Sequence, residues 1–195
     1  GGLMSSSVSQ ELSSGVQKIF STNEAFAALK EDGSVVTWGN GSRGGNSSNV
    51  ADSLSSGVST IFSNTHAFAA LKEDGSVVNW GWSNQSGTAG LSGGVVHVAM
   101  NNSAYAALKE DGSVVTWGSV FSGGSTYAPE PYDSTSNMVA RHLTSGVQKI
   151  VANGSAFTAI KEDGSVISWG DQENGGNNPS LEIANVCYSQ EDLEA

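Results

Sequence analysis

One twelve-residue segment occurs four times in this chain and constrains its fold more than any other feature. It reads ALKEDGSVVTWG at 28–39, ALKEDGSVVNWG at 70–81, ALKEDGSVVTWG at 107–118 and AIKEDGSVISWG at 159–170. A second marker, SGV or GGV, precedes each copy, and the glycines of both markers are spaced by 42, 37 and 52 residues. The whole unit therefore repeats, and only the linker after each Trp-Gly changes in length.

Each unit predicts three short strands. In the first unit these are VQKIFST (16–22), AFAALK (25–30) and SVVTWG (34–39), and β-branched and aromatic residues are frequent in them. The Asp-Gly between the second and third strands favours a tight turn, because glycine accepts a positive φ. The second strand is apolar on both faces, as expected when a small sheet is covered on both sides by its neighbours.

Three-stranded units that recur about every 40 residues predict an all-β fold, a β-propeller whose blades pack face to face around an axis. We expect a single repeat domain over 1–195. Its blades are expected at approximately 14–39, 56–81, 93–118 and 145–170, and 171–195 should hold a C-terminal linker and one strand of a fifth blade. A solenoid of stacked sheets is the alternative architecture.

The first segment of the chain bears on how such a ring would close. Residues 1–16 resemble the linker at 44–58, so the chain opens inside a linker. We therefore expect a piece of a longer repeat array. A ring completed by self-association with a second copy is the other option, and a compact ring of four or five blades is the third.

The charge of the chain limits its partners. The formal net charge is −11, with only 8 Lys and Arg residues. Binding to a nucleic-acid backbone needs clustered basic residues, so nucleic acid is not an expected partner. No apolar run approaches the ~20 residues of a membrane span, so membrane insertion is not expected either. Cys187 is the single cysteine, which excludes an intrachain disulfide.

The motif AFAALKEDGSVVTWG, followed by GG a few residues later, resembles the RCC1-type β-propeller repeat. It is most similar to the short-repeat bacterial branch of that family, which includes a secreted inhibitor of β-lactamases. The resemblance covers roughly residues 14–178 and implies blades that each carry a Trp-Gly. Eukaryotic members carry QLG after the Trp-Gly turn, whereas this chain has NGSRGG or DQENGG there. Together with the acidic charge, that difference argues against a role as an exchange factor or on chromatin.

No constellation of catalytic residues is apparent in the sequence. The adjacent carboxylates of each KEDGS segment lie at a hairpin tip, one pair per blade, whereas acid–base catalysis needs two carboxyls around one substrate. His66, His97 and His142 occupy three different registers, so they do not indicate a metal centre. We therefore expect no enzyme activity, no catalytic residues, no cofactor and no metal. Calcium at the acidic turns is the alternative that their oxygen ligands leave open.

The repeated residues are best explained as structural parts of the blade. One tryptophan per blade at a fixed register indicates packing between neighbouring blades. A ring of aromatic sites for sugar stacking is the alternative. The structural set comprises Trp38, Trp80, Trp117, Trp169, Gly33, Gly75, Gly112 and Gly164.

The segments that break the repeat are the expected binding sites. The linker at 119–143 is ten residues longer than the first linker and carries Phe121, Tyr127 and Tyr132, and Trp82 begins another linker without a counterpart. Loops on a rigid scaffold and exposed aromatic residues are typical of binding sites. We therefore expect a non-enzymatic binding or scaffold module of an extracellular or cell-surface protein that engages a protein partner through its inter-blade loops. A propeller-type protein inhibitor or accessory subunit, and a carbohydrate-binding or carbohydrate-active propeller, are the alternatives.

Overall fold

The computed structural model describes residues 6–82, 91–124 and 139–176, which form four three-stranded antiparallel sheets, one per repeat. The all-β prediction is therefore confirmed. The strands are β1 (Val16–Ser21), β2 (Ala25–Lys30), β3 (Val35–Gly39), β4 (Val58–Ser63), β5 (Ala67–Lys72), β6 (Val77–Gly81), β7 (Val95–Met100), β8 (Ala104–Lys109), β9 (Val114–Gly118), β10 (Val147–Ala152), β11 (Ala156–Lys161) and β12 (Val166–Gly170). The strand expected in 171–195 lies outside the described residues.

Short helical segments occupy the linkers. They include α1 (Ser6–Glu11), η1 (Gly41–Arg43), η2 (Ser48–Val50), η3 (Val120–Ser122) and η4 (Gln172–Asn174). The repeat pattern does not predict α1, because strand periodicity gives no information about the linker that precedes β1. A helix of six residues is too short to be stable alone, so α1 depends on its packing beside β3.

Each sheet is a meander in which the middle strand pairs with both others. The register places an aromatic residue of the middle strand directly opposite the tryptophan of the third strand, as in Phe26 opposite Trp38. The two rings stack in every blade, with centroids 5.3 Å apart for Phe26–Trp38, 5.2 Å for Phe68–Trp80, 4.8 Å for Tyr105–Trp117 and 5.3 Å for Phe157–Trp169. Cross-strand aromatic pairs of this kind stabilise a sheet, so the tryptophan fixes the register of its own blade.

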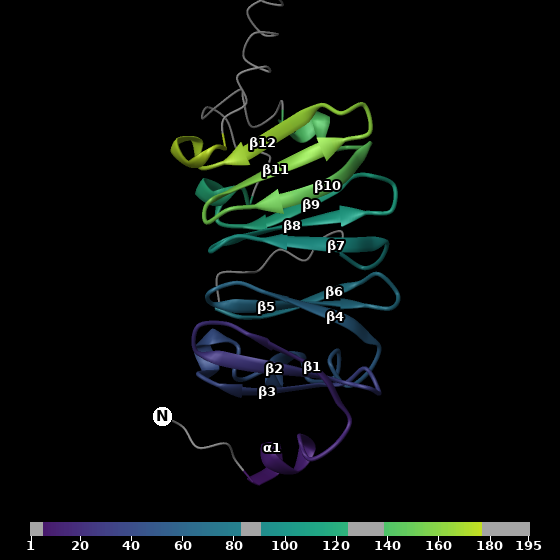
Figure 1. The fold of residues 1–195 in the computed structure, drawn as a ribbon, viewed down its shortest axis with the longest axis vertical. Coiled ribbons are helices and arrows are strands. Elements are labelled where there is room, and N and C mark those ends of the chain that lie inside the picture. The colour runs from purple at the N-terminus through teal and green to yellow at the C-terminus, as the bar shows by residue number, and fades with distance from the viewer. Residues whose placement is uncertain (1–5, 83–90, 125–138, 177–195) are drawn as a thin grey trace, which may run out of the picture.

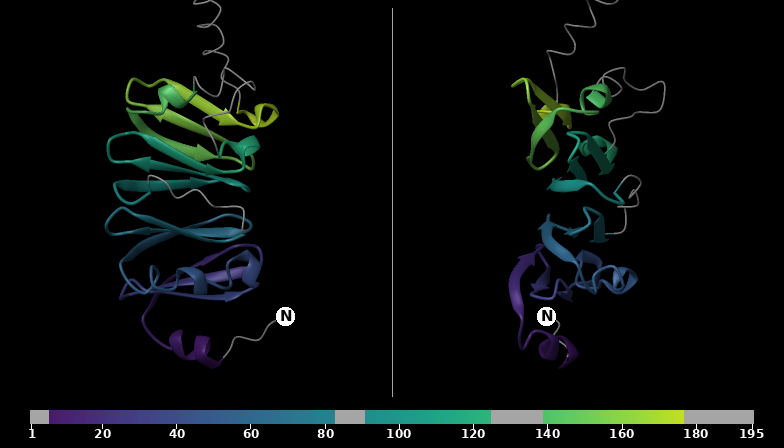
Figure 2. Two further views of the ribbon diagram at one scale, coloured as in Figure 1. Left: turned by 180° about the vertical axis from the view of Figure 1, so that it is seen from behind. Right: turned by 90° about the vertical axis from the view of Figure 1, so that its right-hand side faces the viewer.

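The four blades form one open stack in chain order (Figure 1), with β1–β3 and β10–β12 at opposite ends. The described blades therefore do not close into the compact four-bladed ring considered above. Figure 2 shows that the first strands β1, β4, β7 and β10 lie along one side of the stack and the linker segments with η1, η2 and η3 along the other. This order lets each blade present one face to the preceding blade and the other face to the following blade.

Apolar residues fill each space between blades. We call the face toward the following blade the front face and the face toward the preceding blade the back face. In the first interface, the front face of blade 1 contributes Ala25, Ala27 and Leu29, and the back face of blade 2 contributes Val58, Ile61, Phe68, Ala70 and Trp80. The alanines of the middle strands are fully buried, so small side chains let the sheets approach closely.

A backbone junction joins each blade to the next. The amide of Val58, just after the SGV glycine, donates to the carbonyl of Gly33 in the Asp-Gly turn of the preceding blade, at 3.0 Å. Val95 to Gly75 and Val147 to Gly112 repeat this bond at the same distance. The SGV or GGV marker of one blade therefore contacts the Asp-Gly turn of the preceding blade. This contact explains why the two markers recur at the same spacings along the sequence.

Close approach at the junction requires glycine in the turn. A Cβ atom at Gly112 would lie 2.6 Å from the amide nitrogen of Gly146, and Gly112 has φ +74°. Gly164 has the same conformation, with φ +81°, but a Cβ atom there would meet no described atom within 4 Å. Both glycines thus need a positive φ, but only Gly112 lies against the backbone of the next blade.

We predict that Gly112→Ala destabilises the protein more than Gly164→Ala. Both variants carry the strain of a positive φ, about 1–2 kcal/mol, whereas only Gly112→Ala also pushes a methyl group into the next blade. The difference should be about 1–3 kcal/mol in the free energy of unfolding of the single chain, measured by denaturant titration at a protein concentration low enough to keep it monomeric. Equal losses would contradict the assignment of the turn as an inter-blade junction.

Candidate binding surface

One edge of the stack brings together the turns between the first and second strands and the segments that follow Trp-Gly. We call this edge the exit rim, and it comprises 22–24, 64–66, 101–103 and 153–155 with 39–45, 81–82, 118–124 and 170–176. Backbone bonds join the two kinds of segment in each blade: Trp82 N donates to His66 O at 3.3 Å, and Ser119 N donates to Ser103 O at 2.8 Å. The residues that break the repeat are therefore held on a scaffold that repeats.

A conserved position within the repeats, occupied by Thr22, Asn64, Asn101 and Asn153, organises this rim. The Oδ1 of Asn101 accepts from the amides of Ser103 and Ala104 at 3.0 and 2.7 Å, which closes the turn between β7 and β8. Its Nδ2 donates to the carbonyl of Ser122 at 2.6 Å, which ties the exit segment to the turn. Asn101 is 3% exposed, so its own side-chain amide is bonded away from water. The repeat pattern did not reveal the role of this position, although it lies three residues before each second strand.

We predict that Asn101→Ala lowers the free energy of unfolding by about 1–3 kcal/mol, because buried backbone groups lose their partner. Asn101→Thr should lose less, since Thr22 fills the same position in blade 1 and its Oγ1 accepts from Ala25 N at 3.0 Å. Asn102→Ala is the matched control, because Asn102 is an exposed neighbour. Denaturant titration of the three variants measures the order, and an equal effect of Asn101→Ala and Asn102→Ala would contradict it.

Trp82 is the centre of a polar and aromatic cluster on the exit rim, and it is 42% exposed. The guanidinium carbon of Arg43 lies 5.1 Å from the centroid of the Trp82 ring. The His66 ring meets the indole edge-on, with centroids 4.8 Å apart and planes at 69°. Arg43 belongs to the linker after blade 1 and His66 to blade 2, so the cluster spans two blades.

An acidic group completes this cluster. Glu24 Oε1 lies 3.6 Å from Arg43 Nε, and Glu24 Oε2 accepts from Asn40 Nδ2 at 2.8 Å. Since Glu24 is half exposed, this ion pair orients the guanidinium and contributes little stability. The result is an indole held in place by a cation and an imidazole, with one part still open to solvent. We call Glu24, Arg43, His66 and Trp82 the Trp82 cluster.

Phe121 and its neighbour Val120 lie on the same rim, in η3 after blade 3. They are 84% and 58% exposed, so neither side chain contributes to the core. Their counterparts in η1 are Ser42 and Gly41, and in η4 they are Glu173 and Gln172. The structure thus places two of the four expected binding residues, Trp82 and Phe121, on one edge. Tyr127 and Tyr132 lie outside the described residues.

The carboxylate pairs lie at the opposite edge, in the turns between second and third strands. In each turn the aspartate Oδ1 accepts from the hydroxyl and the amide of the serine two residues on, as at Asp111, where the distances are 2.6 and 2.9 Å. The serine hydroxyl is the largest cause of the lowered pKa of Asp32, Asp74, Asp111 and Asp163. These aspartates therefore stay ionised at neutral pH and close their own turns.

The tryptophans of blades 2–4 face the preceding blade. Trp80, Trp117 and Trp169 are each 3% exposed, and the indole N–H groups of Trp80 and Trp169 donate to Gly44 O and Gly123 O at 3.0 and 3.2 Å. Gly44 and Gly123 belong to exit segments of the preceding blade. Buried indoles cannot stack on a sugar, so these three positions do not support the carbohydrate alternative.

His97 lies on the first strand β7, away from both rims. Its ring meets Phe62 of β4 edge-on at 5.2 Å, and partial desolvation, followed by the charge of Lys149, lowers its pKa. Among the described residues no group of three His, Cys, Asp or Glu side chains is placed to hold a metal ion. None of the described helices is long and apolar enough to cross a membrane.

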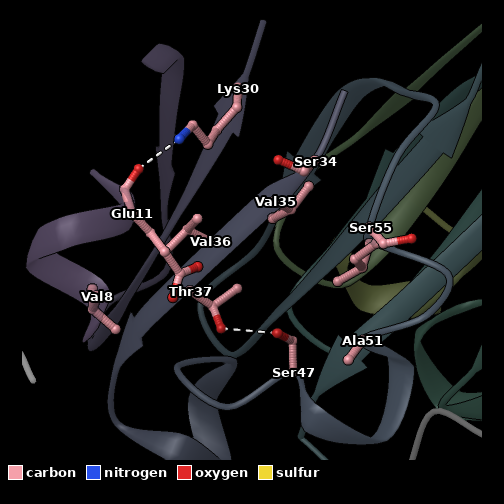
Figure 3. A pocket seen from close by; sticks show the side chains of 11 residues that line it. Val8, Glu11, Lys30, Ser34, Val35, Val36, Thr37, Ser47, Ala51 and Ser55 are labelled. Atoms are coloured by element: carbon pink, nitrogen blue, oxygen red, sulfur yellow. Dashed lines mark hydrogen bonds between the residues drawn. The ribbon is translucent and has the colours of Figure 1, made fainter. Parts of the chain in front are cut away.

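A pocket of ≈ 410 Å³ lies between α1, β3 and the linker that contains η2 (Figure 3). Val8, Val35, Val36 and Leu54 supply its apolar lining. Two pairs of its polar groups bond to each other: Lys30 Nζ donates to the carbonyl of Glu11 at 2.6 Å, and the Thr37 and Ser47 hydroxyls are 3.0 Å apart. The first contact ties α1 to β2 and the second ties the linker to β3, and neither suggests a reaction.

The geometry and the similar solved structures together define the class: the fold is a β-propeller of RCC1-like blades. Human WBSCR16 matches with 19% identity and a TM-score of 0.54, over 80% of this chain and 47% of that chain. Prp20p of Saccharomyces cerevisiae matches with 17% identity and a TM-score of 0.54, over 80% of this chain and 44% of that chain. The ectodomain of the receptor kinase CR4 of Physcomitrella patens matches with 16% identity and a TM-score of 0.51, over 80% of this chain and 38% of that chain.

The chain thus spans less than half the length of these proteins' chains. The sequence matches no protein-family model and no curated protein. At these levels of sequence identity, the structural similarity shows a shared fold.

Proposed function

We propose that this chain is a non-enzymatic scaffold module of an extracellular or cell-surface protein and that its exit rim binds a protein partner. The observation that carries the proposal is the Trp82 cluster. Trp82 takes the position that Asn40, Ser119 and Asp171 occupy after the Trp-Gly of the other blades. A large indole, 42% exposed where the other blades have polar residues, has no role in the repeat itself.

The chemistry of the rim suits a protein partner. Tryptophan and arginine are enriched among the residues that dominate binding energy at protein interfaces. Arg43 and His66 hold the indole in one orientation, so little conformational freedom is lost when a partner covers it. Phe121 and Val120 add a second exposed apolar site on the same rim, in the next blade.

The absence of catalysis in this proposal rests on the separation of the titratable groups. The described aspartates of the KEDGS turns lie one per blade, and their carboxylates accept hydrogen bonds from serine hydroxyls and amides of the same turn. A general acid needs a raised pKa near the working pH, whereas the pKa of each of these groups is lowered. These turns therefore suit a structural role.

Propellers of this fold offer a precedent for protein binding. The Prp20p structure is described with its binding to Gsp1p and histones, and yeast RCC1 (Prp20) was solved bound to Kap60, at 20% identity to this chain. For the present chain we propose the short-repeat bacterial branch as the setting, on the KEDGSVVTWG motif. The extracellular location rests on the low fraction of charged residues, 14%, and on the Ser- and Asn-rich linkers.

Site-specific crosslinking tests this proposal. A photo-crosslinking amino acid at Phe121, on the exit rim, should capture one protein from the native source, whereas the same amino acid at Glu110, on the opposite edge, should not. Once that protein is purified, Trp82→Ser should weaken its binding about 10-fold or more. Trp82→Ser copies the Ser119 of blade 3, so the fold should be kept. Equal capture at both positions, or an unchanged affinity for Trp82→Ser, would contradict the proposal.

A further inference from the structure

The back face of blade 1 is exposed at positions that are buried in every other blade. Ile19 is 60% exposed, whereas its counterparts Ile61, Val98 and Ile150 are at most 3% exposed. Phe26 is 44% exposed, whereas Phe68, Tyr105 and Phe157 are at most 1% exposed. In blades 2–4 these side chains are covered by the front face of the preceding blade. The difference therefore marks a part of the back face of blade 1, beside α1, that no described residue covers.

The front face of blade 4 is exposed in the complementary way. Ile160 is 39% exposed, whereas Leu29, Leu71 and Leu108 at the same position are at most 8% exposed. Val166 is 50% exposed, and Gly164 and Gly175 have no described atom within 4 Å of a Cβ position. In the inner blades the equivalent glycines touch the next blade: Gly33 lies against Gly57, and Gly44 lies against Phe68.

We propose that these two surfaces bind each other, so that the front face of blade 4 in one copy of the chain packs on the back face of blade 1 in a second copy. The three interfaces within the chain show the contacts to expect. Val16 N would donate to Gly164 O of the other copy, as Val58 donates to Gly33. The Trp38 indole N–H would donate to Gly175 O of the other copy, as Trp80 donates to Gly44.

A second copy is the occupant that the molecule itself specifies, because one chain carries both halves of the interface. Such a head-to-tail contact is heterologous, and it ends only when the assembly closes into a ring. The chain covers 47% and 44% of the propellers WBSCR16 and Prp20p, so two stacks supply blades on the scale of one complete ring. The assembly then leaves the exit rim uncovered, because the rim lies at the edges of the blades rather than on their faces.

The oligomeric state of the full 195-residue chain, measured by light scattering after size exclusion, tests the pairing. The expected mass is twice the 19.9 kDa of the chain. Ile19→Lys and Val166→Lys each place a charge in the interface and should weaken self-association at least about 100-fold. Both side chains are exposed in the single stack, so the variants should fold.

Val96→Lys is the matched control, because Val96 is 47% exposed on β7 and its counterparts are Gln17, Ser59 and Gln148. It should keep the mass of the unchanged chain. Mixing the two monomeric variants should restore a dimer, since the intact back face of Val166→Lys can receive the intact front face of Ile19→Lys. A monomeric unchanged chain would overturn the proposal, and so would a dimer that survives either end-face variant or a mixture that stays monomeric.

Discussion

Each blade of this stack is joined to the next where the glycine of an Asp-Gly turn lies against the glycine before the following first strand. At this place Val58, Val95 and Val147 each donate an amide to the turn carbonyl of the blade before, at 3.0 Å. The alanines of the middle strands carry only a methyl group, which extends a short way from the backbone. The apolar layers between blades can therefore form only if the two backbones approach this closely. The junction therefore sets the spacing on which the buried tryptophans and the rim depend.

The same geometry separates the structural residues from the candidate functional ones. Residues that face a neighbouring blade are under the same constraint in every copy, so KEDGSVVTWG scarcely varies. Residues on the exit rim project from the edges of the blades, and their identity is free to differ as long as the turn below is held. Trp82 and Phe121 use that freedom in two successive blades. A rim of this kind can change its partner without any change in the core.

Sequence periodicity was sufficient to predict the sheets, because strand residues and turn glycines recur at fixed distances from Trp-Gly. It also identified Trp82, since that residue has no counterpart in the other copies. It could not identify Arg43 or His66 as neighbours of Trp82, because that contact forms across two blades and depends on how they stack. The role of Asn101 was missed for a similar reason: its side chain bonds to an exit segment 21 residues away, which no local pattern shows.

Hydrogen exchange of individual amides tests most directly whether the junctions hold the stack together. The amides of Val58, Val95 and Val147 bond across the space between blades, whereas those of Ser34, Ser76 and Ser113 bond to aspartates in exposed turns. If the junctions hold the blades, the valine amides should exchange only when blades separate, and therefore far more slowly than the serine amides. Valine amides that exchange as fast as the serine amides would contradict this account.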